Sequence, residues 1–180
     1  MDIFMPMSAT VRHNKIIMNL IARLWNRIEK KELHALSEEC SLVYWGSPFE
    51  ISSLRLVNLS EIDDIQAFKD GVIEDLYCVQ PDLMVFDLQP YAENKRQTKT
   101  AGQPDLIIEV WSDGNTKVDR DFKKFLYSTS DKTEHWYIEQ DSNEVQCFLG
   151  QNSLPSQSLL NVLRTTNGIE FDLRAMAITD

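Results

Sequence analysis

Residues 103–111, QPDLIIEVW, decide the fold, because they form the most hydrophobic strand-like stretch of the 180-residue chain. A nearly continuous, β-branched apolar run is typical of a central strand that is covered on both faces. Alternate residues of a strand share a face. Leu106, Ile108 and Val110 therefore form a clean apolar face that we expect to pack into a core.

The opposite face of this strand carries two acids, Asp105 and Glu109, roughly 13 Å apart at the rise of an extended chain. A carboxylate that is buried without a partner is costly. A glutamate between Ile108 and Val110 is rarely tolerated in a buried strand unless it is paired. We therefore look elsewhere in the chain for groups that meet Glu109.

A second QPDL motif supplies a third carboxylate, Asp82, at the start of a predicted strand over residues 81–88. If residues 81–88 and 105–111 pair as antiparallel neighbours, Asp82 lies close to Glu109. Two close carboxylates repel each other, so a positive group must offset them or one must stay protonated. One or two carboxylates with several waters are the ligands that Mg²⁺ prefers.

A short helix predicted over residues 119–129 follows directly and places a lysine, Lys123, where it can return beside the sheet. Lys124 competes for this role, and a solvated helix face is the alternative explanation for Lys123. A carboxylate pair, a lysine and a divalent metal together suit phosphodiester hydrolysis. The metal polarises the phosphate and lowers the pKa of a water, and the lysine stabilises charge that grows on the phosphate oxygens.

The remaining pattern predicts an α/β (α+β) fold, a mixed sheet flanked by helices. Apolar residues at helical spacing predict an amphipathic helix over residues 10–33, with Trp25 in its stripe. Other expected elements are strands at 41–45, 49–57, 134–139 and 144–149, a helical turn near 61–69, a polar loop from 89 to 104, and a strand and short helix at the end of the chain. We expect one domain over residues 1–180, with its core at 79–149.

Composition limits the possible functions. The net charge is −10, which argues against strong non-specific DNA binding through a global basic face. Residues 93–124 nevertheless carry a net +1 against −11 for the rest, so a polyanion would approach there. Three cysteines without metal spacing indicate reduced thiols and a cytoplasmic protein. No apolar run is long enough for a membrane helix.

The segments VQPDLMVFD, GQPDLIIEVWSDGNTKVDRDFKKFLY and EHWYI resemble the Uma-type restriction-endonuclease family of the PD-(D/E)XK nuclease superfamily. The resemblance covers residues 79–149 and implies an αβββαβ core with a Mg²⁺ or Mn²⁺ site. Asp82 matches the PD aspartate and Glu109 the second acid of the motif. The lysine expected two residues later is replaced by Trp111, and Lys123 matches a basic residue on the following helix.

These observations predict a metal-dependent endonuclease that hydrolyses DNA, with Asp82 and Glu109 as metal ligands and Lys123 as the third catalytic group. Asp105 and His13 are possible supporting residues, although loop capping and a structural histidine are the simpler explanations for them. A catalytically inactive nuclease fold that binds or scaffolds is the alternative. A homodimer is a third expectation, motivated by apolar residues of the 41–57 hairpin.

Overall fold

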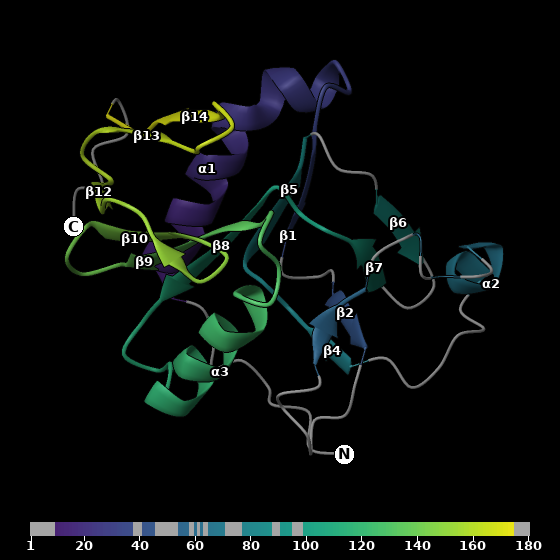
Figure 1. The fold of residues 1–180 in the computed structure, drawn as a ribbon. Coiled ribbons are helices and arrows are strands. Elements are labelled where there is room, and N and C mark those ends of the chain that lie inside the picture. The colour runs from purple at the N-terminus through teal and green to yellow at the C-terminus, as the bar shows by residue number, and fades with distance from the viewer. Residues whose placement is uncertain are drawn as a thin grey trace.

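The computed structural model describes residues 10–37, 41–45, 54–57, 60, 62, 65–70, 77–87, 91–94 and 99–174. These residues form a seven-stranded mixed sheet with a helix on each face, a five-stranded second sheet and a two-stranded ribbon (Figure 1). The fold class expected from the sequence, a mixed sheet flanked by helices, is confirmed.

The main sheet has the strand order β1-β5-β8-β9-β10-β11, and β12 also pairs with β10. Its strands are β1 (His34–Ser37), β5 (Leu83–Phe86), β8 (Leu106–Trp111), β9 (Glu134–Glu139), β10 (Glu144–Leu149), β11 (Asn152–Ser153) and β12 (Gln157–Ser158). The parallel neighbours β8 and β9 are joined by the helix α3 (Lys117–Tyr127). β8 is therefore central, between β5 and β9, as its apolar sequence predicts.

The two faces of β8 pack against different helices. Leu106, Ile108 and Val110 lie in a core with the helix α1 (Val11–Glu29). Ile107 and Trp111 lie in a second core on the α3 face. Figure 1 shows α1 and α3 on opposite sides of the sheet. The alternation predicted for this strand is confirmed, and the acid face is the face that α3 covers.

The helix α1 begins after Thr10, whose side chain accepts a hydrogen bond from the amide of His13. It ends at Glu29, four residues before the predicted end. Leu20 and Leu24 are buried in the stripe as predicted, but Trp25 is 53% exposed. The prediction for Trp25 was wrong because one residue is a rotation of about 100° around a helix, which carries this side chain off the buried stripe.

The second sheet corrects the prediction of a polar loop over residues 89–104. Two strands in this range, β6 (Tyr91–Asn94) and β7 (Lys99–Gly102), pair antiparallel. β7 also pairs with β2 (Ser41–Trp45), which in turn pairs with β3 (Arg55–Leu56) and β4 (Tyr77–Val79). These strands have polar sequences and no apolar run that would identify them. They form because they pair with neighbouring strands.

The helix α2 (Ile65–Asp70) confirms the turn predicted near residues 61–69. The ribbon consists of β13 (Val162–Arg164) and β14 (Glu170–Asp172), and β14 confirms the predicted closing strand. The short helix predicted after it lies outside the described residues, as does the first part of the 49–57 strand.

The apolar residues of the 41–57 hairpin that the structure describes are part of the core; residues 46–53 lie outside the described ranges. In the 41–57 segment, Leu42 and Tyr44 are fully buried, and Leu54 and Leu56 are 2% and 6% exposed. They pack with residues of the main sheet. Because these four side chains are covered within one chain, they offer no apolar surface to a second copy, and the homodimer stays a prediction.

Within the described ranges, no helix is both long enough and apolar enough to cross a membrane.

Candidate active site

The antiparallel pairing of β5 and β8 brings two of the predicted acids together. Leu83 pairs with Ile108 in this ladder, and the next position in the same register sets Asp82 opposite Glu109. Directly opposed residues of antiparallel strands point to the same face and lie about 5 Å apart. Asp82 of the first QPDL motif and Glu109 of the central strand therefore lie at the same level of the sheet, on neighbouring segments.

Glu109 is 1% exposed, and both of its oxygens are hydrogen-bonded. The ammonium of Lys123 lies 2.9 Å from Oε2, and the hydroxyl of Tyr127 donates to Oε1 at 2.5 Å. The pKa of Glu109 is raised to about 7, chiefly by burial and also by the nearby charge of Asp82, although Lys123 and the Tyr127 hydrogen bond act to lower it. Burial thus disfavours the charged form of Glu109 by more than the contact with Lys123 favours it.

Asp82 is anchored from two sides. Its Oδ2 accepts a hydrogen bond from the amide of Val110 at 2.6 Å. The same oxygen lies 3.1 Å from Nε2 of His13, in the first turn of α1. His13 is 7% exposed, so it lies in the interior of the protein. Although α1 packs on the face of the sheet opposite α3, its His13 thus contacts one of the two acids, Asp82.

Lys123 and Lys124 are neighbours on α3 but serve opposite flanks of the helix. Lys123 contacts Glu109 and donates to the carbonyl of Gln80 at 3.4 Å. Although burial alone lowers the pKa of Lys123, attraction to Glu109 and then to Asp82 outweighs it and raises the pKa. Lys124 instead donates to Gln146 on β10 at 3.2 Å. The geometry assigns the site position to Lys123.

Asp105 is placed at the other end of its strand. Its Oδ2 accepts a hydrogen bond from the amide of Asp87 at 2.7 Å, which ties the end of β5 to the start of β8. This contact matches the loop-capping explanation. The structure therefore brings Asp82, Glu109, Lys123 and His13 together and leaves Asp105 outside the group.

Sequence reasoning missed Tyr127. Its ring is buried in the core, at 1% exposed. Its hydroxyl nevertheless orients Glu109, and burial with the nearby Glu109 carboxyl raises the pKa of this tyrosine well above its usual range. A usable signal was present in its spacing, since Lys123 and Tyr127 are four residues apart and share one helix face.

The donor set fits a hard divalent cation that keeps part of its water shell. Asp82 and Glu109 supply carboxylate oxygens, each of which has more than one acceptor position. A bound cation would also favour the charged form of Glu109, which burial and the nearby Asp82 disfavour. Among the residues that the structure describes, no group of three or more His, Cys, Asp or Glu side chains could hold a metal. Such a pair suits Mg²⁺ or Mn²⁺ with waters, not a closed zinc site.

Comparison with known families agrees with this arrangement. The model of the Uma2 family, described as "Putative restriction endonuclease", matches residues 73–176. The chain belongs to the Uma2 family. The matched range includes Asp82, Glu109 and Lys123, and it excludes the N-terminal helix that carries His13.

A solved structure supports the same fold. The chain is similar to a crystal structure titled as a putative nuclease belonging to DUF820 from Anabaena variabilis. The two are 14% identical, the match covers 94% of this Uma2 chain and 83% of the other, and the TM-score is 0.57. At this identity the likeness shows the fold alone. No curated protein matches the chain.

Proposed function

We propose that this Uma2 protein is a metal-dependent endonuclease that hydrolyses phosphodiester bonds in DNA. The observation that carries the proposal is the contact of Lys123 with the buried Glu109, directly opposite Asp82 in the sheet. In this proposal Asp82 and Glu109 hold Mg²⁺ or Mn²⁺, and Lys123 contacts the phosphate. The bound ion would polarise the phosphate and lower the pKa of a water.

The protein's own groups have separate roles in this reaction. Tyr127 and Lys123 fix the two oxygens of Glu109, so the carboxylate is oriented before substrate binds. Val110 and His13 do the same for Asp82. The Lys123 side chain is 18% exposed, which leaves its ammonium partly open to a phosphate oxygen. Donors that are already oriented stabilise transition-state charge without reorganisation.

The test is cleavage of single-stranded, duplex and branched DNA by the purified protein in Mg²⁺ or Mn²⁺. Glu109→Ala and the more conservative Glu109→Gln are expected to abolish it. Glu170→Gln is the matched control, because Glu170 is an exposed acid paired with Arg164 on the distant ribbon. Cleavage that survives in folded Glu109→Gln protein would remove Glu109 from the site.

A catalytically inactive nuclease fold is the second candidate. Two observations favour it: the position two residues after Glu109 is Trp111 and not lysine, and the described residues contain only a carboxylate pair where a metal would bind. Calorimetry with Mg²⁺ and Mn²⁺ separates the candidates. Millimolar or tighter binding that is lost in Asp82→Asn supports the nuclease, whereas no heat in the parent protein supports the inactive fold.

We also propose a cytoplasmic location. Cys147 is a free thiol, as expected where thiols are kept reduced. Burial raises the pKa of Cys147 to about 11, so this thiol behaves as a small apolar side chain. Fractionation of cells followed by detection of the protein tests the location.

A further inference from the structure

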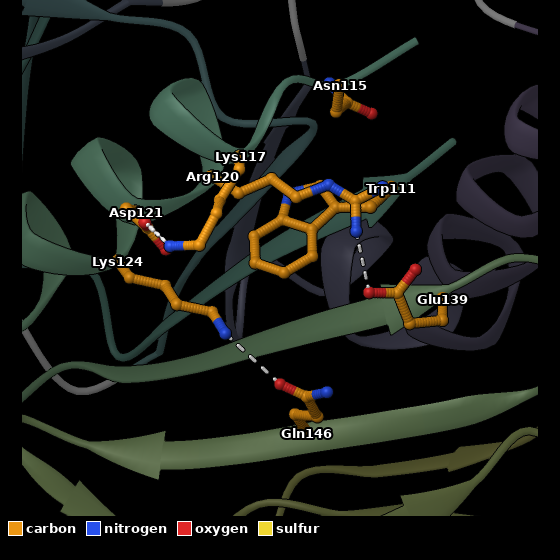
Figure 2. A pocket seen from close by; sticks show the side chains of 8 residues that line it. All are labelled: Trp111, Asn115, Lys117, Arg120, Asp121, Lys124, Glu139 and Gln146. Atoms are coloured by element: carbon orange, nitrogen blue, oxygen red, sulfur yellow. Dashed lines mark hydrogen bonds and ion pairs between the residues drawn. The ribbon is translucent and has the colours of Figure 1, made fainter. Parts of the chain in front are cut away.

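The flank of α3 that faces away from Glu109 borders two cavities that share Lys124. The first, of about 350 Å³, is shown in Figure 2 and is rich in charge. Its lining includes three cations, Lys117, Arg120 and Lys124, against two acids, Asp121 and Glu139. In a chain of net charge −10, a lining with more cations than acids attracts anions locally.

Two buried donors beside this cavity have no partner among the residues that the structure describes. They are the indole Nε1 of Trp111, which is 2% exposed, and Nε of Arg120. The other Arg120 nitrogens donate to Glu139 at 2.9 Å and to the carbonyl of Ser112 at 2.8 Å. A buried donor without an acceptor is costly. Two such donors next to cations indicate a ligand with several acceptor oxygens.

Lys124 lies over a group of aromatic rings at the junction of the two cavities. Its Nζ is 4.9 Å from the centre of the Trp111 ring, 5.1 Å from Tyr137 and 5.8 Å from Phe148. Burial lowers the pKa of Lys124, and Arg120 and Lys117 lower it further against two acids. The ammonium is thus held in place by ring faces, with one hydrogen bond to Gln146, and crowded by other cations.

The second cavity, of about 250 Å³, is mainly aromatic. Phe125, Phe148, His135 and Tyr137 line it, and the rings of His135 and Phe148 are stacked with centres 5.4 Å apart. Phe125, on α3, is 39% exposed. An exposed phenylalanine beside a stacked ring pair is the kind of surface on which nucleobases stack.

We propose that this flank of α3 binds one nucleotide unit of a DNA single strand, with the phosphate in the basic cavity and the base in the aromatic cavity. Lys124 lies between them and contacts the phosphate together with Arg120 and Trp111. This proposal rests on the proposed function in one respect, the choice of DNA as the ligand. It assigns no step of cleavage to these residues, because Glu109 lies on the other flank.

The test measures binding in a chelator, where no metal-dependent cleavage occurs. Fluorescein-labelled oligothymidine is titrated by anisotropy, and thymidine 5′-monophosphate, inorganic phosphate and thymidine are used as competitors. Lys124→Gln is expected to weaken binding about tenfold, as for loss of a charged phosphate contact. It also lowers the slope of log K against log salt concentration by about 0.7, the value for one phosphate on a single strand.

Phe125→Ser is expected to weaken binding of oligothymidine and of the monophosphate about fivefold, as for loss of one stacked base, and to leave competition by inorganic phosphate unchanged. The matched control is Lys69→Gln, since Lys69 is an exposed lysine on α2, far from α3 in Figure 1. This variant should bind like the parent. Melting temperatures establish that all variants are folded.

Three results would overturn the proposal: Lys124→Gln and Lys69→Gln have equal effects, inorganic phosphate competes as well as the monophosphate, or Phe125→Ser binds like the parent. Glu109→Gln is measured in parallel. If it binds normally and the parent cuts no DNA, the nucleotide site stands and the proposed nuclease fails. If the parent cuts DNA but the Lys124 and Phe125 variants bind normally, the proposed nuclease stands and the nucleotide site fails.

Discussion

The sharpest physical test compares two adjacent lysines of α3, Lys123→Gln and Lys124→Gln, in metal-free protein. Both changes remove one positive charge from the same helix. Only Lys123 contacts the buried Glu109, at 2.9 Å, whereas Lys124 donates to Gln146. If the contact geometry is right, only the first variant changes how stability depends on pH.

The magnitude follows from the pKa of Glu109. Its folded value is about 7 against 4.5 for an ordinary glutamate, so the folded state holds a proton that the unfolded state loses. Stability from this group is therefore full below pH 4.5 and is lost as pH rises to about 7, and this loss amounts to about 3 kcal/mol. Without Lys123, which lowers this pKa, the folded value rises further and the loss continues above pH 7.

The difference in unfolding free energy between parent and Lys123→Gln should therefore widen by up to about 2 kcal/mol between pH 6 and pH 8.5, at 1.36 kcal/mol per unit. Urea unfolding followed by tryptophan fluorescence in a chelator measures it. Lys124→Gln should show a small difference that stays constant over this range. Equal and flat losses for the two variants would refute the proposed role of Lys123 beside Glu109.

Three further results are expected. Tyr127→Phe leaves one oxygen of the buried Glu109 without its donor and should cost about 1–3 kcal/mol in urea unfolding at pH 8; a variant as stable as the parent contradicts the contact. Mg²⁺ at ten times its dissociation constant should raise the unfolding free energy by about 1.4 kcal/mol in the parent and not in Asp82→Asn, as measured by thermal melting. Burial lowers the pKa of His135 from 6.5 to about 4, so the unfolded state binds a proton at a higher pH than the folded state does. About 3 kcal/mol of stability is therefore lost as pH falls from about 6.5 to about 4. His135→Gln should remove that loss. Subtracting its pH profile of unfolding free energy from that of the parent cancels the opposite contribution of Glu109, which both proteins share. Identical profiles for the two proteins would contradict the prediction.

Local chemistry made much of the central sheet predictable. β9 and β10 have the bounds expected from the sequence, and β8 lies within one residue of its expected start. Their apolar runs are long and are separated by turn residues, so periodicity alone identifies them. The same pattern predicted which face of β8 carries Glu109. Strands of the second sheet such as β6 were missed because their sequences are polar, and their stability depends on pairing with distant segments.

The candidate site was predictable where two strands share a motif. Pairing the strands that follow the two QPDL motifs as antiparallel neighbours sets Asp82 opposite Glu109, and the observed pairing of Leu83 with Ile108 agrees with this register. His13 was a weak prediction, since no pattern along the chain shows that the start of α1 reaches Asp82. The role of the Tyr127 hydroxyl was not predicted, because the residue looks like core in sequence and its partner is visible only in three dimensions.

The sequence by itself determined that β8 is central, that its acids share one face, and that a helix with two candidate lysines follows. These features depend on the alternation of side chains between the two faces of a strand and on the burial of apolar residues. Both are visible within a few consecutive residues. Only the tertiary structure decided between Lys123 and Lys124, separated Asp105 from the site and exposed Phe125 beside the second cavity. Those outcomes depend on how α3 is rotated against the sheet. That rotation is set by the packing of Leu126 and Tyr127 into a core assembled from distant strands.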